Sequence, residues 1–225
     1  MISGILIINK PAGPTSHDIV DKIRRITKVK KVGHAGTLDP FAKGVLIILI
    51  NKATKAQQKF MILHKTYTAI IFLGAVSNTY DKTGNISVLN NTPPIKRNAI
   101  KKILKNFTGE IKQIPPAFSA IKINGKRAYE LARKGIKLKL KPRKIKIYNI
   151  KLLKYNWPYL EIKIKCSKGT YIRSLANDIG KKLGCGAYLK ELTRNKIGKF
   201  NLKKAINLDK ITKDNWQNYI SMVVN

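Results

Sequence analysis

Short, nearly continuous apolar runs separated by turn-rich loops constrain the fold of this chain more than any other feature. Each run has the length and composition of a buried strand, and none is long enough to cross a bilayer as a helix. The three clearest are Gly4–Asn9 (GILIIN), Val45–Ile50 (VLIILI) and Lys65–Val76 (KTYTAIIFLGAV). They predict strands buried within a sheet.

The remaining patterns mix helices with strands. Thr15 or Ser16 caps a predicted helix in which Ile19, Val20 and Ile23 recur at helical spacing. We expect further helices at Asn98–Phe107, Tyr129–Arg133 and Tyr171–Leu183, and strands at Phe118–Ile123, Lys144–Tyr155 and Leu160–Cys166. Because these elements do not alternate as βαβ units, the pattern favours an α+β fold with a mixed sheet over a doubly wound fold.

No repeat, linker or low-complexity segment divides the chain. We therefore expect one domain over residues 1–225, with an inserted arm at about residues 110–142. Within that domain, Leu160, Ile162 and Ile164 alternate with charged residues. This alternation predicts that one face of their strand meets solvent.

The charge balance points to an anionic partner. The chain has 46 Lys and Arg against 11 Asp and Glu, a formal net charge of +35. Such an excess attracts polyanions, of which nucleic acid is the commonest in a cell. The alternative is a compositional one, because the chain is rich in Lys, Ile and Asn, as an AT-rich coding sequence would produce. On that alternative, much of the charge is lysine on solvated faces.

Cysteine and histidine are too few and too scattered to favour a metal centre. Cys166 and Cys185 are not in CxxC spacing, and the three histidines form no HExxH motif. Reduced thiols are therefore expected. The N-terminal apolar run is cut short by Lys10 and Pro11, unlike a signal peptide. We expect a soluble, cytoplasmic protein without a membrane span.

The densest candidate for chemistry is Gly33–Pro40 (GHAGTLDP). Its two glycines permit tight turns and close approach of a ligand, and Asp39 is one of few acids in the chain. Taken alone, Asp39 fits a local hydrogen bond in an Asp-Pro turn better than a catalytic role. No phosphate-binding GxxxxGK[ST] loop, GxGxxG fingerprint or GxSxG elbow occurs.

Five ordered blocks nevertheless resemble the TruB family of tRNA pseudouridine synthases. The blocks run in family order from residue 4 to about 212, and together they are far more specific than any one of them. They are GILIINKPAGPTSHDIV, GHAGTLDPFAKGVLIILINKATK, Lys65-Thr66-Tyr67, IPPAFSAIKINGKRAYELARKG and CSKGTYIRSLANDIGKKLGCG. The resemblance implies the pseudouridine synthase fold, with a mostly antiparallel central sheet flanked by helices and loops and a thumb-like arm.

The resemblance also implies roles for particular residues. Asp39 aligns with the catalytic aspartate, Tyr67 with the aromatic residue that packs on the target uracil, and Arg173 with the arginine that pairs with the aspartate. His34 aligns with a residue that holds the base out of the RNA stack. The other residues assigned to substrate binding are Tyr171, Leu192, Lys10 and Asp81, and Leu192 fits a core position as well.

The chemistry agrees with these roles. Isomerising uridine breaks and re-forms one glycosidic bond, so neither a cofactor nor a metal is expected. A carboxylate near C1′ can act as nucleophile or charge stabiliser, and an arginine keeps that carboxylate ionised. The target base must leave the stack to be reached. The implied partner is tRNA, through the T-arm uridine at position 55, with neither DNA nor membrane as a partner and a monomeric enzyme.

Two departures from the family pattern qualify the resemblance. Ser77-Asn78-Thr79 stands where the family usually has Thr-Asp-Thr, although Asp81 and Gly84 still fit. We also expect no C-terminal PUA domain, so that grip on tRNA comes from the catalytic domain, the arm and the positive charge. The competing functions are a non-catalytic RNA-binding protein on the same scaffold, a relative guided by RNA and partner proteins, and a general basic DNA-binding or ribosomal protein.

Overall fold

The structure is a computed structural model that describes residues 2–90, 92–123 and 125–222. The chain forms two compact units, Met1–Tyr67 with Leu192–Asn225, and Thr68–Glu191. Two strands, β4 (Lys65–Leu73) and β12 (Ala187–Ile197), pass from one unit into the other. The expectation of a single domain stays a prediction.

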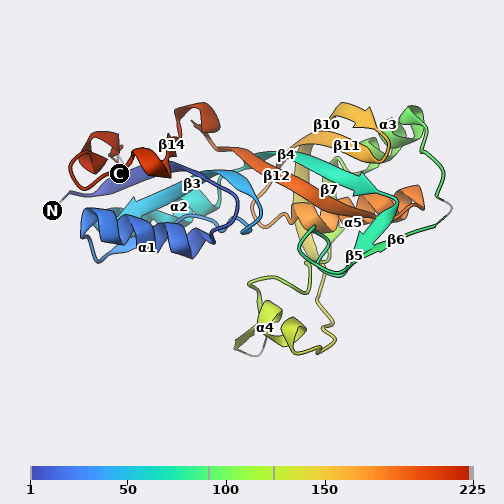
Figure 1. The fold of residues 1–225 in the computed structure, drawn as a ribbon, viewed down its shortest axis with the longest axis horizontal. Helices are drawn as coiled ribbons and strands as arrows, with labels where there is room; N and C mark the ends of the chain where they lie inside the picture. The colour runs from blue at the N-terminus through green and yellow to red at the C-terminus, as the bar shows by residue number, and fades with distance from the viewer. Residues whose placement is uncertain (1, 91, 124, 223–225) are drawn as a thin grey trace. The chain divides into compact units, whose positions relative to one another are not determined.

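The first unit is built on a sheet in the order β14-β1-β3-β12 (Figure 1). Strand β1 (Gly4–Lys10) pairs antiparallel with β3 (Lys43–Ile50), and β2 (Val32–His34) also pairs with β3. The short strands β13 (Phe200–Asn201) and β14 (Ile206–Asn207) pair with β12 and β1. Strands β3 and β12 run parallel.

Strand β3 is apolar from Val45 to Ile50 because both of its faces are covered there. Leu46, Ile48 and Ile50 pack into one core cluster with helix α1 (Ser16–Thr27) and Trp216. Val45, Ile47 and Leu49 pack into a second cluster. That cluster lies beneath the 3-10 helix η1 (Asn51–Ala56) and helix α2 (Gln57–Met61). The predicted buried strand is confirmed, as is the helix that follows the Thr15 cap.

The second unit has the strand order β4-β11-β10-β7, with the first residues of β12 beside β4. Strand β10 (Arg143–Asn156) pairs antiparallel with β11 (Tyr159–Cys166) and with β7 (Gly109–Gln113). Helices α3 (Arg97–Asn106) and α5 (Ile172–Leu183) contact each other, and α3 packs on β10. A hairpin of β5 (Ala75–Ser77) and β6 (Ile86–Val88) completes this unit.

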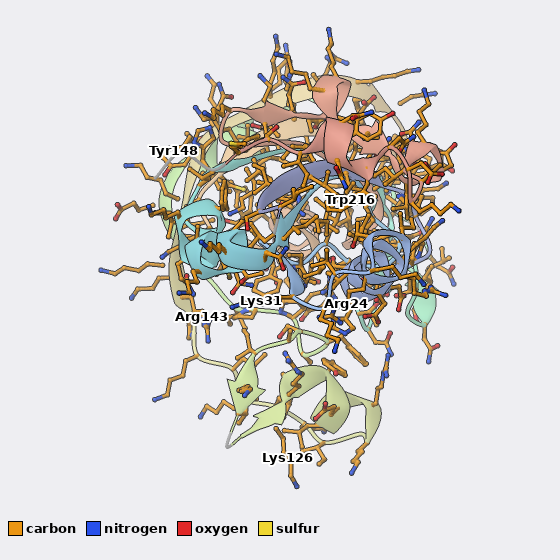
Figure 2. All side chains as sticks on the ribbon, turned by 90° about the vertical axis from the view of Figure 1, so that its left-hand side faces the viewer. Arg24, Lys31, Lys126, Arg143, Tyr148 and Trp216 are labelled. Carbon is orange, nitrogen blue, oxygen red and sulfur yellow. The ribbon has the colours of Figure 1, made fainter. Side chains whose placement is uncertain are left out.

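The arm of the second unit is small. It contains β8 (Lys122–Ile123), β9 (Lys126–Arg127) and helix α4 (Ala128–Arg133). Figure 1 shows it as a lobe joined through β7 and β10, and Figure 2 labels Lys126, which is exposed. The lobe lies within the range 110–142 expected for the arm, although residues 110–113 belong to strand β7 of the sheet. The mixed, mostly antiparallel α+β architecture is confirmed.

Three expectations for the secondary structure were wrong in detail. The run Lys65–Val76 is two strands, because the chain turns at Gly74, where φ is 86°. The strand predicted at Phe118–Ile123 is reduced to Lys122–Ile123, since residues before it form bends. The eleven-residue strand β12 was not anticipated, because charged residues interrupt its apolar pattern. Of the Asn124-Gly125 turn, Asn124 lies outside the described residues.

No helix among the described residues is long and apolar enough to cross a membrane. Cys166 and Cys185 are both buried and outside any disulfide.

Candidate active site

Asp39 lies half-buried on the loop that joins β2 to β3. The loop contains an Asp-Pro turn in which the Ala42 amide donates to the Asp39 carbonyl at 3.1 Å. Gly36, with φ of 97°, adopts the left-handed conformation that glycine tolerates best. The turn foreseen for Asp39 therefore exists, and one of its hydrogen bonds is accepted by the Asp39 carbonyl.

Arg194, on β12, fixes this loop from beneath. Its guanidinium donates to the carbonyls of Val45 at 2.7 Å, Thr37 at 3.0 Å and Gly36 at 3.1 Å, and its side chain is 1% exposed. The neighbouring β3 approaches closely enough that a Cβ on Gly44 would lie 2.3 Å from the Arg194 carbonyl oxygen. A planar fork of donors suits this cluster of carbonyls better than a point charge would.

Lys10 holds the other side of the same loop. Its buried ammonium donates to the carbonyls of Pro14 at 2.7 Å, Pro11 at 2.8 Å and Pro40 at 3.1 Å. Burial, and secondly the Arg194 guanidinium, lowers its pKa from 10.5 to about 8, although Asp39 opposes the shift. All three protons of the charged group are used by carbonyls, so Lys10 positions the loop. A direct contact with substrate stays a prediction.

Ser16 ties the loop to helix α1. Its hydroxyl donates to the Leu38 carbonyl at 3.0 Å and accepts from the Leu38 amide at 2.8 Å. The helix itself begins with a reciprocal capping box between Thr15 and Asp18. The residue immediately before Asp39 is thus clamped to the first turn of a well-capped helix.

His34 ends strand β2 at the start of the loop. Its carbonyl accepts from the Gln57 side chain at 2.8 Å, and its Nδ1 is buried without a hydrogen-bond partner. Burial, and secondly Arg194, lowers the pKa of the imidazole, so it is neutral at physiological pH. The role assigned to His34 in holding the flipped base stays a prediction.

Tyr67 and Leu192 are buried side chains of the first unit. They lie on β4 and β12 and are 8% and 5% exposed. Such burial is shared by core residues and by residues that line a closed pocket, and their contact with a base stays a prediction.

In the second unit, Arg173 of α5 is held by one carboxylate and two carbonyls. Its guanidinium lies 3.4 Å from Asp81, donates to the Phe118 carbonyl at 3.1 Å and to the Thr79 carbonyl at 3.4 Å. Arg173 and Asp81 are both buried. Asp39 belongs to the first unit and Arg173 to the second, so the pairing of these two residues stays a prediction.

Asp81 anchors the turn between β5 and β6. Its Oδ1 accepts from the Thr79 hydroxyl at 2.8 Å and from the Thr83 amide at 2.9 Å, while Oδ2 faces Arg173. The hydroxyl of Ser77 donates to the Asp81 carbonyl at 2.6 Å. Asp81 is therefore a positioning group for Arg173 in this structure, and its assignment to substrate binding stays a prediction.

The departure from the family pattern at residues 77–79 is accommodated locally. Asn78 accepts the Asn85 amide through its Oδ1 at 2.9 Å, a bond that a carboxylate would accept as well. The hydroxyl of Ser77 supplies the same type of donor as the usual threonine. The turn is retained, and the net change is one lost negative charge.

Tyr171 joins α5 to the base of the arm. Its amide donates to Gln113 Oε1 at 2.8 Å, and its carbonyl accepts from Gln113 Nε2 at 3.0 Å. The Ser174 hydroxyl donates to the Ile114 carbonyl at 2.8 Å. The chain therefore enters the arm at a point fixed by the first turn of α5.

Sequence reasoning did not propose Arg194 and Gln113, whose hydrogen bonds hold the Asp39 loop and the main chain of Tyr171. Arg194 lies among several basic residues, and only its burial distinguishes it. Among the described residues, no group of three or more His, Cys, Asp or Glu side chains is arranged to hold a metal ion.

Comparisons with known proteins agree on one family. The model of the TruB family pseudouridylate synthase N-terminal domain matches residues 24–172, and that of the tRNA pseudouridylate synthase B C-terminal domain matches residues 173–222. The tRNA pseudouridine synthase B of Clostridium tetani is 48% identical over 97% of this chain and 76% of its own length. That of Prochlorococcus marinus is 50% identical over 94% and 68%.

Among solved structures, the chain is similar to one chain of a Cbf5-Nop10-Gar1 complex, with a TM-score of 0.75 and 32% identity over 95% of this chain. It is also similar to a chain of the archaeal box H/ACA sRNP Nop10-Cbf5 complex, with a TM-score of 0.71 and 28% identity. The chain spans about half the length of those solved chains, 54% and 55%.

Proposed function

The chain belongs to the TruB family of pseudouridylate synthases, and from this premise we propose that it isomerises the T-loop uridine of tRNA, at position 55, to pseudouridine. The substrate follows from relatives that are named tRNA pseudouridine synthase B and match nearly the whole chain. The enzyme acts on the T-arm as a monomer in the cytoplasm, with neither cofactor nor metal.

The observation that carries the proposal is the construction of the Asp39 loop. Two buried cations and one buried hydroxyl hold main-chain atoms on both sides of Asp39. Precise placement of a reacting group accounts for a large part of enzymatic rate enhancement, because a misplacement of about 1 Å can cost 10²-fold. A carboxylate that only made a turn would need no such support.

In this proposal Asp39 assists cleavage of the glycosidic bond, either by attack on C1′ or by way of a glycal. Tyr67 stacks on the freed uracil while it turns, an interaction worth about 1–3 kcal/mol per base. Arg173 pairs with the Asp39 carboxylate, and His34 with Tyr171 and Leu192 encloses the flipped base. Each step uses groups of this chain alone.

The proposal is tested with an unmodified tRNA transcript, by chemical labelling of pseudouridine and primer extension. Wild-type protein should give one stop in the T-loop, and Asp39→Asn should lose about 10³-fold or more in rate, as removal of a reacting group does. Asp214→Asn, at an exposed acid of the same unit, is the matched control and should be fully active. A wild-type protein that binds the transcript without modifying it would favour the non-catalytic RNA-binding alternative.

A further inference from the structure

One face of the sheet in the second unit carries many exposed lysine side chains. In β10 and β11 the buried side chains, such as Ile145, Ile147 and Ile164, lie on the side covered by α3. The alternate side chains on these strands and on β7 are exposed. They include Lys112, Lys144, Lys146, Lys151, Lys163 and Lys165.

The strand register brings like charges opposite each other at two places, whereas Lys146 lies opposite Glu110. Lys112 is the cross-strand partner of Lys144, and Lys151 is the partner of Lys163. Directly opposed like charges destabilise a sheet. Lysine scattered by composition alone carries no preference for such partners, whereas an anion that bridges both strands would relieve the repulsion.

An exposed aromatic ring lies within this face. Tyr148 is 47% exposed, at a β-bulge where the register shifts between Ile147 and Asn149 (Tyr148 is labelled in Figure 2). The ammonium groups of Lys165 and Lys146 lie 5.9 and 6.0 Å from its ring centroid. Bulges commonly re-aim a side chain, and here the result is an aromatic ring flanked by two ammonium groups.

We propose that this lysine face, centred on Tyr148, binds a strand of RNA outside the reacting arm. Phosphates neutralise the opposed lysines, and Tyr148 contacts an unpaired base or its ribose, the arrangement that proteins use for single strands. The identity of the RNA as tRNA rests on the proposed function. An acidic protein surface would also neutralise the lysines, but it would not require an exposed ring between them.

The test measures binding of a tRNA transcript to the full chain by fluorescence anisotropy over a range of salt concentrations. The variant K144Q/K146Q/K165Q removes three charges from the face. The control K101Q/K102Q/K105Q removes three exposed charges from α3. Loss of three phosphate contacts should lower the slope of log K against log salt by about 2–3. The control should change the slope by less than half as much.

A second comparison isolates the ring. Tyr148→Ala should weaken binding of RNA with unpaired nucleotides several-fold and leave binding of a fully paired RNA duplex unaffected. Equal losses in the two lysine variants would show that affinity follows total charge and would overturn the proposal, as would unchanged binding in the sheet variant. Binding is measured separately from pseudouridine formation. A wild-type protein that forms no pseudouridine would therefore refute the proposed function, while the binding of the variants would still decide whether the lysine face binds RNA.

Discussion

Replacing Arg194 with methionine tests whether the Asp39 loop depends on a buried cation. Methionine approximates the length of the side chain but removes all three hydrogen bonds to carbonyls of the loop and β3. The three acceptors differ in exposure: Val45 is fully buried, Gly36 is half-buried and Thr37 is exposed. Water can therefore replace the guanidinium at Thr37 but not at Val45.

These differences in exposure determine how much the free energy of unfolding falls in Arg194→Met. An orphaned buried acceptor costs about 1–3 kcal/mol, and each of the other two bonds contributes about 0.5–1.5 kcal/mol. Relief of the arginine's own desolvation offsets part of this. The free energy of unfolding should fall by about 2–4 kcal/mol. Under conditions where the variant remains folded, kcat should fall about 10- to 100-fold through displacement of Asp39, with KM little changed.

Urea denaturation gives the stability, and single-turnover pseudouridine formation gives the rate. Arg194→Lys should recover part of the rate, because an ammonium reaches some of the carbonyls without the planar fork. Arg25→Met, at an exposed arginine of α1, is the matched control and should change neither quantity. A folded Arg194→Met protein with wild-type kcat would refute the claim that Arg194 positions Asp39.

Three further predictions concern buried groups near the candidate residues. Lys10 has a pKa of about 8 when folded and 10.5 when unfolded, so the unfolded chain binds more protons between these values and stability rises with pH there. Between these pH values, the unfolding free energy of wild type should therefore rise by up to about 3 kcal/mol relative to that of Lys10→Met. Urea titrations at a pH below and a pH above this window measure the rise. A difference between the two proteins that does not change with pH would contradict the burial argument. Asp81→Asn should destabilise the chain by about 3 kcal/mol and lower kcat more than KM changes, because it removes the buried carboxylate that lies 3.4 Å from Arg173. Wild-type kinetics would show that Arg173 does not need Asp81. Gly44→Ala places a Cβ against Arg194 at a φ of 116° and should cost about 3 kcal/mol or more in thermal unfolding; an unchanged melting temperature would mean that the two strands separate easily.

Most of the fold could be predicted because its central elements carry strong local patterns. Strand β3 is apolar from Val45 to Ile50, helix α1 has both a cap and helical spacing, and β11 alternates cleanly. Strand β12 was not predicted because its partner strands come from distant parts of the chain. Its charged residues are tolerated wherever one face of the strand meets solvent. The predicted ends of strands were wrong where a single residue such as Gly74 turns the chain.

The candidate site divides in the same way. Asp39, Tyr67 and Arg173 stand in ordered motifs, so the sequence alone could propose them. Their supports could not be proposed, because Arg194 looks like any other basic residue among 46 until its burial is known. Local sequence motifs contain the candidate reacting residues. The residues that position them, such as Arg194, can be recognised only from contacts between segments that are far apart in the sequence.

The confinement of the Lys10 amine has a practical consequence. Most lysines of this chain react freely with an acylating reagent because they are exposed, whereas Lys10 is fully buried against three carbonyls. When the loop opens, the burial that lowers the Lys10 pKa is lost, and the amine becomes accessible to the reagent as the exposed lysines are. The acylation rate at Lys10, followed by peptide mass mapping, therefore reports how often the loop opens. It requires no dye, cysteine or substitution in the protein.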